Sequence, residues 1–146
     1  MRAVLDSNVL VSAILSSSGP PRRLLDGARA QRFELLSSAV LMTELFDVIS
    51  RAKFAARLAR AGFTPFGIAS DIWRLAIIAT PLVVPRVIAG DADDDHVLAC
   101  GAAGDADMIV TGDHDFDHLG GSYQGIQIAS PVSRRPEFSW ATEHAC

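Results

Sequence analysis

Short runs of branched apolar residues alternate along this chain with segments that repeat apolar residues at helical spacing. The runs lie at residues 3–5, 33–36, 82–84, 108–111 and 126–128, and such runs are typical of strands buried on both faces. Strands that alternate with helical segments indicate an α/β protein with a mostly parallel sheet. We therefore expect an α/β fold whose central sheet has four or five strands, with helices on both faces.

Length and patterning together predict one domain. The chain has 146 residues, which is enough for a single core without disulfide or metal crosslinks. No internal repeat, low-complexity block or interdomain linker divides it, but the pattern fades after Pro131. We therefore predict a domain over residues 1–131 and a C-terminal tail over residues 132–146.

Helix start signals lie between the apolar runs. Ser37 or Ser38 is a suitable N-cap for the helix that follows the second run. Thr64 is a suitable N-cap for a later helix, because a proline follows it, and apolar residues then repeat at helical spacing up to Pro81.

Acidic residues follow two of the predicted strands. Asp6 comes directly after the run at residues 3–5, and Asp113 and Asp115 follow the run at residues 108–111. The carboxyl ends of parallel strands meet at one edge of a sheet, where ligands bind in such folds. We therefore expect these carboxylates to lie close together.

A third acidic group, residues 91–95, contains four aspartates and precedes an apolar helical segment. Its carboxylates repel one another unless they are solvated or neutralised by a divalent cation and by the positive end of the following helix. Acidic residues are favoured in the first turn of any helix, so a solvated helix start remains an alternative interpretation of this group alone.

Glu44 lies on the apolar stripe of its predicted helix. Leu41, Glu44, Leu45 and Val48 follow one another at the spacing of a single helix face. A carboxylate that faces the core is costly unless it has a partner. The alternative is that Glu44 lies at the edge of the stripe and reaches solvent.

Several converging carboxylates without a cysteine or histidine ligand pattern form an oxygen site that suits Mg²⁺ or Mn²⁺. Hydrolysis of phosphodiester bonds is a frequent use of such sites. His114 and His118 are near the acidic residues but show no ligand pattern, so we expect both in solvent-exposed loops. Cys100 and Cys146, the two cysteines, also lack ligand spacing.

Positive charge is carried almost entirely by arginine, and the net charge of −4 argues against bulk electrostatic coating of nucleic acid. One predicted helix is nevertheless basic. Such a helix is either a solvated face or a track for phosphate groups beside an acidic site. Its candidate contacts are Arg51, Lys53, Arg57 and Arg60, with Arg22 and Arg23 as further candidates.

No apolar stretch approaches the roughly 20 residues that span a bilayer, and Asp6 interrupts the N-terminal region where a signal peptide needs continuous apolar residues. We therefore expect a soluble, cytoplasmic protein with no membrane partner.

Four segments, taken in order, resemble the successive motifs of PIN-domain proteins. They are residues 5–12, 38–45, 91–99 and 110–113. The resemblance extends from Met1 to about Pro131 and is closest to the VapC-like ribonucleases, which are toxin components of toxin–antitoxin systems. Two positions differ from the family pattern, since Ser7 replaces the commoner threonine and Ala92 replaces proline.

The resemblance implies a three-layer α/β/α sandwich and Mg²⁺- or Mn²⁺-dependent cleavage of RNA. It also implies that Asp93 and Asp95 are alternatives to Asp94 as the third acid of the site. By position in the motifs, the catalytic acids would be Asp6, Glu44, Asp94 and Asp113, and the metal ligands Asp6, Asp94, Asp113 and Asp115. RNA would contact Arg51, Lys53, Arg57 and Arg60.

Two other classes remain open. Aspartate-dependent phosphotransfer domains resemble the first motif, but they need a second aspartate where this chain has Asn8, and a late lysine, whereas Lys53 is the only lysine. A non-catalytic RNA- or protein-binding module with a PIN-like fold is the other alternative.

Two predicted helices carry more apolar surface than is needed to cover a five-stranded sheet. On this ground we expect a homodimer or a docked cognate antitoxin. The faces are formed by Leu24 with Leu25, and by Ile68, Ile72 and Leu75.

Overall fold

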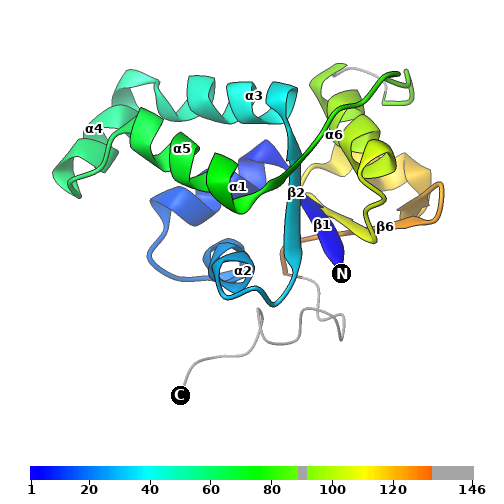
Figure 1. Cartoon of the computed structure of the whole chain (residues 1–146), viewed down its shortest axis with the longest axis horizontal. Coiled ribbons are helices and arrows are strands. Elements are labelled where there is room, and N and C mark those ends of the chain that lie inside the picture. The colour runs from blue at the N-terminus through cyan, green and yellow to red at the C-terminus, as the bar shows by residue number, and fades with distance from the viewer. Residues whose placement is uncertain (89–91, 133–146) are drawn as a thin grey trace.

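The computed structural model describes residues 1–88 and 92–132, except for the side chains of Ala92 and Asp93. Figure 1 shows the arrangement of the elements, which follow one another in this order: β1 (Arg2–Leu5), α1 (Ser7–Leu15), α2 (Pro20–Arg29), β2 (Glu34–Ser38), α3 (Ala39–Ile49), α4 (Ala52–Arg60), α5 (Pro65–Leu75), β3 (Ile77–Ala79), α6 (Ala92–Ala103), β4 (Met108–Val110), the 3-10 helix η1 (His114–Leu119), β5 (Ser122–Tyr123) and β6 (Ile126–Ala129).

The strands form one sheet in the order β3-β2-β1-β4-β6-β5. All neighbouring pairs are parallel except β5 and β6, which are antiparallel. The prediction of a mostly parallel sheet is confirmed. The sheet has six strands rather than the four or five expected, because the two-residue β5 adds an edge that no sequence pattern indicated.

The prediction of a strand at residues 82–84 is wrong. The third strand is β3, which lies where we had expected the end of α5, and Ile77 to Ala79 pair with Leu36 to Ser38. Leu82 and Val83 are 96% and 78% exposed. Prolines precede and follow residues 82–84, and since proline lacks a backbone N–H, this segment is a poor partner for a sheet.

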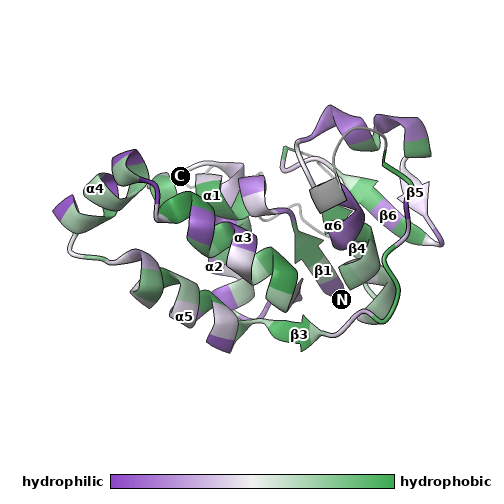
Figure 2. Cartoon of the chain, turned by 90° about the horizontal axis from the view of Figure 1, so that it is seen from above, coloured by the Kyte–Doolittle hydropathy of each residue, from purple (hydrophilic) through white to green (hydrophobic). Residues whose placement is uncertain are grey.

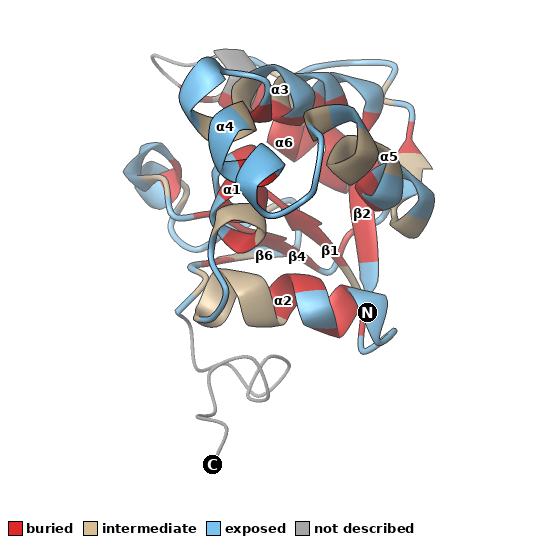
Figure 3. Cartoon of the chain, turned by 90° about the vertical axis from the view of Figure 1, so that its left-hand side faces the viewer, coloured by how far each residue is buried: buried red, intermediate tan, exposed pale blue. Residues whose placement is uncertain are grey.

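The alternation of side chains along each strand divides the interior into two cores. In β1, Ala3 and Leu5 belong to the core that contains buried residues of α1, α2 and α5, whereas Val4 belongs to the core that contains buried residues of α6. Side chains two residues apart share one face of a sheet. In Figure 3, α2 lies below the strands and α6 lies above them, so the three-layer α/β/α sandwich is confirmed.

Start signals for two helices are confirmed in detail. Ser38 is the N-cap of α3, and its Oγ accepts a hydrogen bond of 3.3 Å from the backbone N–H of Leu41. Thr64 caps α5 in the same way, through the N–H of Gly67 at 3.0 Å. Each cap satisfies a backbone N–H that the helix itself leaves without a partner.

The apolar faces that we expected to bind a partner are instead used within the chain. Leu24, Leu25 and Ile72 are at most 1% exposed, and Ile68 and Leu75 pack against the same core. The premise of the partner prediction is therefore wrong for these residues. Within the described part of the chain, no helix is long and apolar enough to cross a membrane.

Candidate active site

Asp6 and Thr111 lie at the carboxyl ends of two adjacent parallel strands, β1 and β4. The Asp6 carboxylate is nearly inaccessible, since the residue is 4% exposed. The hydroxyl of Thr111 donates to Asp6 Oδ2 at 2.8 Å and accepts the backbone N–H of Asp113 at 3.1 Å. One buried hydroxyl therefore connects two of the predicted catalytic acids, and its role was missed in the sequence.

Burial raises the pKa of the Asp6 carboxyl above its usual range. The Thr111 hydroxyl and the backbone amides of Ser7 and Asn8 act in the opposite direction, because they stabilise the charged form. The nearby carboxylate of Asp113 raises the pKa further by repulsion. A positive charge beside Asp6 would therefore stabilise the ionised form of this buried carboxyl.

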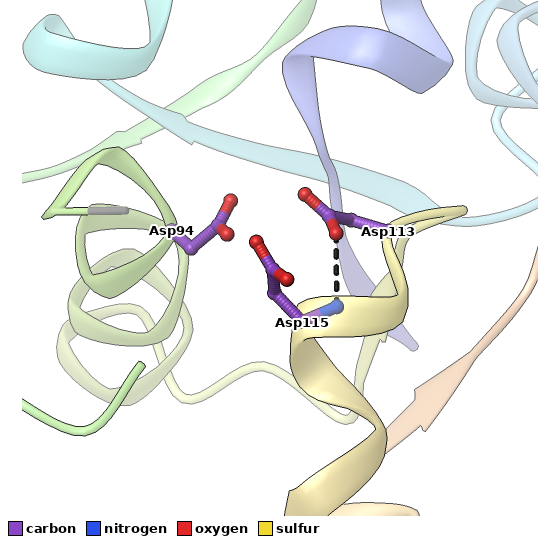
Figure 4. A group of neighbouring side chains, drawn as sticks. All are labelled: Asp94, Asp113 and Asp115. Carbon is purple, nitrogen blue, oxygen red and sulfur yellow. Dashed lines mark hydrogen bonds between the residues drawn. The ribbon is translucent and has the colours of Figure 1, made fainter. Parts of the chain in front are cut away.

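The end of β4 leads into η1, which positions Asp113 and Asp115. Asp113 is the N-cap of η1, and its Oδ1 accepts the backbone N–H of Asp115 at 2.9 Å, shown as a dashed line in Figure 4. Asp113 is half-buried and Asp115 is exposed. This turn directs both carboxylates toward α6.

Asp94 completes this group from the first turn of α6 on the other side. It is 5% exposed, and one carboxylate oxygen from each of Asp94, Asp113 and Asp115 lies within 4.8 Å of the others. Figure 4 shows the three side chains pointing toward one another from α6 and η1. Three of the four predicted metal ligands are therefore brought together, and Asp6 is linked to them through Thr111.

Asp95, which follows Asp94 in the sequence, has a different set of contacts. Asp95 is buried and accepts the backbone N–H groups of Val87 at 3.0 Å and Ile88 at 2.8 Å. It therefore binds the preceding segment rather than joining the acidic group. The side chain of Asp93 and all of Asp91 lie outside the described residues, as does the chain from residue 133 onward.

Glu44 lies at the edge of the apolar stripe of α3 and is half-buried, whereas Leu41 and Leu45 are 2% and 0% exposed. Its Oε2 accepts a hydrogen bond of 3.1 Å from the hydroxyl of Ser7, the residue next to Asp6. Glu44 is thus connected to the start of α1, next to Asp6, but it lies outside the group formed by Asp94, Asp113 and Asp115.

Both histidines of this region lie outside the acidic group and are exposed, as we expected. His114 Nδ1 lies 3.0 Å from a carboxylate oxygen of Asp117. His118 contacts backbone carbonyl oxygens only among its described partners, namely those of Asp115 at 2.8 Å and Val87 at 3.2 Å.

The predicted RNA contacts of α4 are far from the acidic group. Helices α4 and α6 lie at opposite ends of the molecule in Figures 1 and 2. Arg51, Lys53, Arg57 and Arg60 are all exposed, although Arg57 also donates to the carbonyl oxygen of Leu15 at 3.1 Å. Arg51, which precedes α4, lines the same hollow as Glu44, whereas α4 itself lies away from α6.

The acidic group offers only carboxylate oxygens as ligands. Asp94 is buried, Asp113 is half-buried and Asp115 is exposed. Hard divalent cations prefer such ligands, and Mg²⁺ in particular binds through a few carboxylates while keeping several waters. Because Asp113 is half-buried and Asp115 is exposed, solvent reaches this group. The residues present therefore fit a site for a divalent cation.

Comparison with known proteins identifies the family. A family model described as a PIN domain matches residues 2–115, a range that contains Asp6, Glu44, Asp94, Asp113 and Asp115. No curated protein and no solved structure matches the chain. The match covers most of the chain, and the chain therefore belongs to the PIN-domain family.

Proposed function

We propose that this protein is a Mg²⁺- or Mn²⁺-dependent ribonuclease that hydrolyses phosphodiester bonds of RNA. PIN domains are in general metal-dependent nucleases, and the acidic group is compatible with that activity. The observation that carries the proposal is the approach of Asp94, Asp113 and Asp115 to within 4.8 Å. Without a cation, three carboxylates at this separation repel one another.

Each acidic residue has a distinct role in this proposal. Asp94, Asp113 and Asp115 bind the cation. Asp6 is the central acid, and Thr111 connects it to the backbone of Asp113. When bound, a divalent cation polarises the scissile phosphoryl group and lowers the pKa of water. Glu44 lies outside the acidic group, where its carboxylate orients the attacking water and accepts a proton, while Ser7 holds its Oε2 in place.

Cleavage of a labelled single-stranded RNA tests this function directly. We expect the wild-type protein to cut in the presence of Mn²⁺ or Mg²⁺ and to stop in excess EDTA. Asp94→Asn should be inactive, whereas Asp117→Asn, an exposed acid in η1 that pairs with His114, should cut as the wild type does. Cleavage that survives EDTA would contradict the proposal, and Mn²⁺-independent RNA binding without cleavage would favour a non-catalytic module.

The finer proposal is that the chain is the cytoplasmic toxin of a toxin–antitoxin pair and binds a cognate antitoxin. The order of its four motifs supports this assignment, since they are closest to the VapC-like branch. Induced expression should arrest growth, and co-expression of a small protein encoded beside it should relieve the arrest. Growth that continues despite active ribonuclease in the cell would point to a housekeeping role.

We also propose that the protein forms a homodimer, through a different surface from the one first expected. A hollow of about 550 Å³ lies between α3 and α5 and is bordered by Phe46, Phe66 and Trp73, which are 38%, 73% and 45% exposed. Exposed aromatic clusters of this kind are typical of interfaces. Light scattering should give a dimer mass that falls to the monomer mass in Phe66→Ser.

A further inference from the structure

The two elements that carry the acidic group are connected through a third segment, residues 87–88. Asp94 belongs to α6, and Asp115, 21 residues further along the chain, belongs to η1. Their carboxylates repel each other when no cation is bound. Something in the protein must therefore hold α6 and η1 together against this repulsion if the site is to exist before the cation arrives.

Asp95 attaches residues 87–88 to α6. Its Oδ1 accepts two backbone N–H groups, from Val87 at 3.0 Å and from Ile88 at 2.8 Å. Consecutive helical residues point about 100° apart around the helix axis, so the same first turn directs Asp94 toward the acidic group and Asp95 toward this segment. The two hydrogen bonds thereby fix the rotation of the turn that carries Asp94.

His118 attaches the same segment to η1. Its Nε2 lies 3.2 Å from the carbonyl oxygen of Val87, and its Nδ1 lies 2.8 Å from the carbonyl oxygen of Asp115. A ring nitrogen donates to a carbonyl oxygen only when it carries a hydrogen, so a neutral imidazole makes one of these two hydrogen bonds and an imidazolium makes both. In the protonated form, the ring links the backbone of a candidate metal ligand to the segment that Asp95 holds.

An apolar contact supports the polar connection. Ile88 is 6% exposed and belongs to the same core cluster as Phe116 of η1 and Val97 and Leu98 of α6. Residues 87–88 are therefore held by both elements, through hydrogen bonds on the backbone of the segment and through packing of the Ile88 side chain.

We propose that Asp95 and His118 are positioning residues of the metal site: they hold residues 87–88 between α6 and η1 and so set the separation of the Asp94 and Asp115 carboxylates. This inference rests on the proposed metal-dependent function. Neither residue belongs to the acidic group itself. They act by building the site in advance, so that cation binding does not have to order two separate elements.

The variants His118→Ala and Asp95→Ala test this inference, and the chain offers a control for each. His114→Ala removes an exposed histidine from the same 3-10 helix that contacts only the Asp117 side chain among its described partners. Asp117→Asn removes one exposed acidic charge without touching residues 87–88. The primary measurement is Mn²⁺ affinity, determined by electron paramagnetic resonance of the free ion, at a temperature where every variant is folded.

We expect His118→Ala and Asp95→Ala to weaken Mn²⁺ binding by about 10- to 100-fold, as is typical when a residue that orients metal ligands is removed. RNA cleavage should fall in the same proportion at limiting Mn²⁺ and recover toward the wild-type rate at saturating Mn²⁺. Both controls should bind Mn²⁺ as the wild type does. Because His118 is exposed, its alanine variant should fold even if Asp95→Ala does not.

Three results separate the ways in which these proposals can fail. Wild-type Mn²⁺ affinity in both His118→Ala and Asp95→Ala, whatever their melting temperatures, would show that these residues only stabilise the fold and would overturn the positioning role. A wild-type protein that binds Mn²⁺ but cuts no RNA would overturn the proposed function, while the affinity series would still decide the positioning role. A wild-type protein that binds no Mn²⁺ would overturn both.

Discussion

The two halves of the candidate site hold their carboxylates by different means. On the side of α1 and α3, Asp6 and Glu44 each accept a hydrogen bond from a side-chain hydroxyl, that of Thr111 at 2.8 Å and that of Ser7 at 3.1 Å. On the side of α6 and η1, three carboxylates approach one another within 4.8 Å. In the first half, hydroxyl donors offset part of the cost of a carboxylate whose pKa burial still raises at Asp6, whereas in the second half facing carboxylates repel one another unless a cation binds.

This difference predicts which residues affect metal binding and which affect folding. Hydroxyl donors stabilise a carboxylate whether or not a cation is present, and hydrogen bonds to a charged group contribute about 1.5–3 kcal/mol. Facing carboxylates destabilise the metal-free protein and stabilise the metal-bound one. The predictions below test this contrast from the largest expected effect to the smallest.

The largest effect should come from Asp113→Asn, because Asp113 belongs to the acidic group and also repels Asp6. We expect cleavage to fall by more than about 100-fold, beyond the 10- to 100-fold typical of residues that only orient ligands. Stability without metal should hold or rise. A rate within about threefold of the wild type would remove Asp113 from the mechanism.

A pH series on Asp6→Asn tests the other half of the site. The folded-state pKa of Asp6 is raised, chiefly by burial, so its stabilising contribution is fully present below the unfolded-state pKa of about 3.9 and is lost as the pH rises through the higher folded-state value. Without metal, the free energy of unfolding of the variant should therefore rise relative to that of the wild type as the pH increases through that window. A difference in the free energy of unfolding between variant and wild type that is the same at every pH would contradict the raised pKa.

Ser7→Ala should have a smaller and different effect. The change removes the hydroxyl that donates to Glu44, and since Glu44 is half-buried we expect a loss of stability of about 1.5 kcal/mol, at the lower end of that range, which is the same with and without Mn²⁺. Chemical denaturation in both conditions measures it. Loss of stability only in the presence of Mn²⁺ would place Glu44 among the metal ligands instead.

The smallest effect on the reaction should come from α4. Neutralising the exposed Arg51, Lys53 and Arg60 should leave the turnover rate on a short RNA unchanged, because this helix lies at the opposite end of the molecule from α6. Affinity for a long RNA should weaken, and the slope of log affinity against log salt should fall by about 0.7 for each phosphate group that the variant no longer neutralises. An unchanged slope would make α4 a solvated face; Arg74→Gln is a control on α5.

Much of this architecture could be predicted because it depends on local patterns. The run at residues 3–5 followed by Asp6 predicts a strand that delivers an acid to the sheet edge, and the cap at Ser38 predicts where α3 begins. The position of β3 could not be predicted in this way. Ile77 to Ala79 become a strand only because β2 offers them a parallel edge, and residues 82–84 have a similar apolar composition without such a partner.

The supporting contacts of the site were also beyond a sequence pattern. Thr111 was evident only as the end of an apolar run, yet its hydroxyl connects Asp6 with the backbone of Asp113. The contact of His118 with Val87 joins residues 31 positions apart. Such contacts depend on how α6 and η1 pack together, which no periodicity records.

Thermal unfolding of the wild type and of Asp94→Asn, each with and without Mn²⁺, tests the central claim most directly. If Asp94, Asp113 and Asp115 hold a divalent cation, Mn²⁺ should raise the melting temperature of the wild type in proportion to ligand binding, whereas Asp94→Asn should melt at or above the wild-type temperature without metal and gain little from Mn²⁺. Equal Mn²⁺-induced stabilisation of the two proteins, or none in the wild type, would contradict the account.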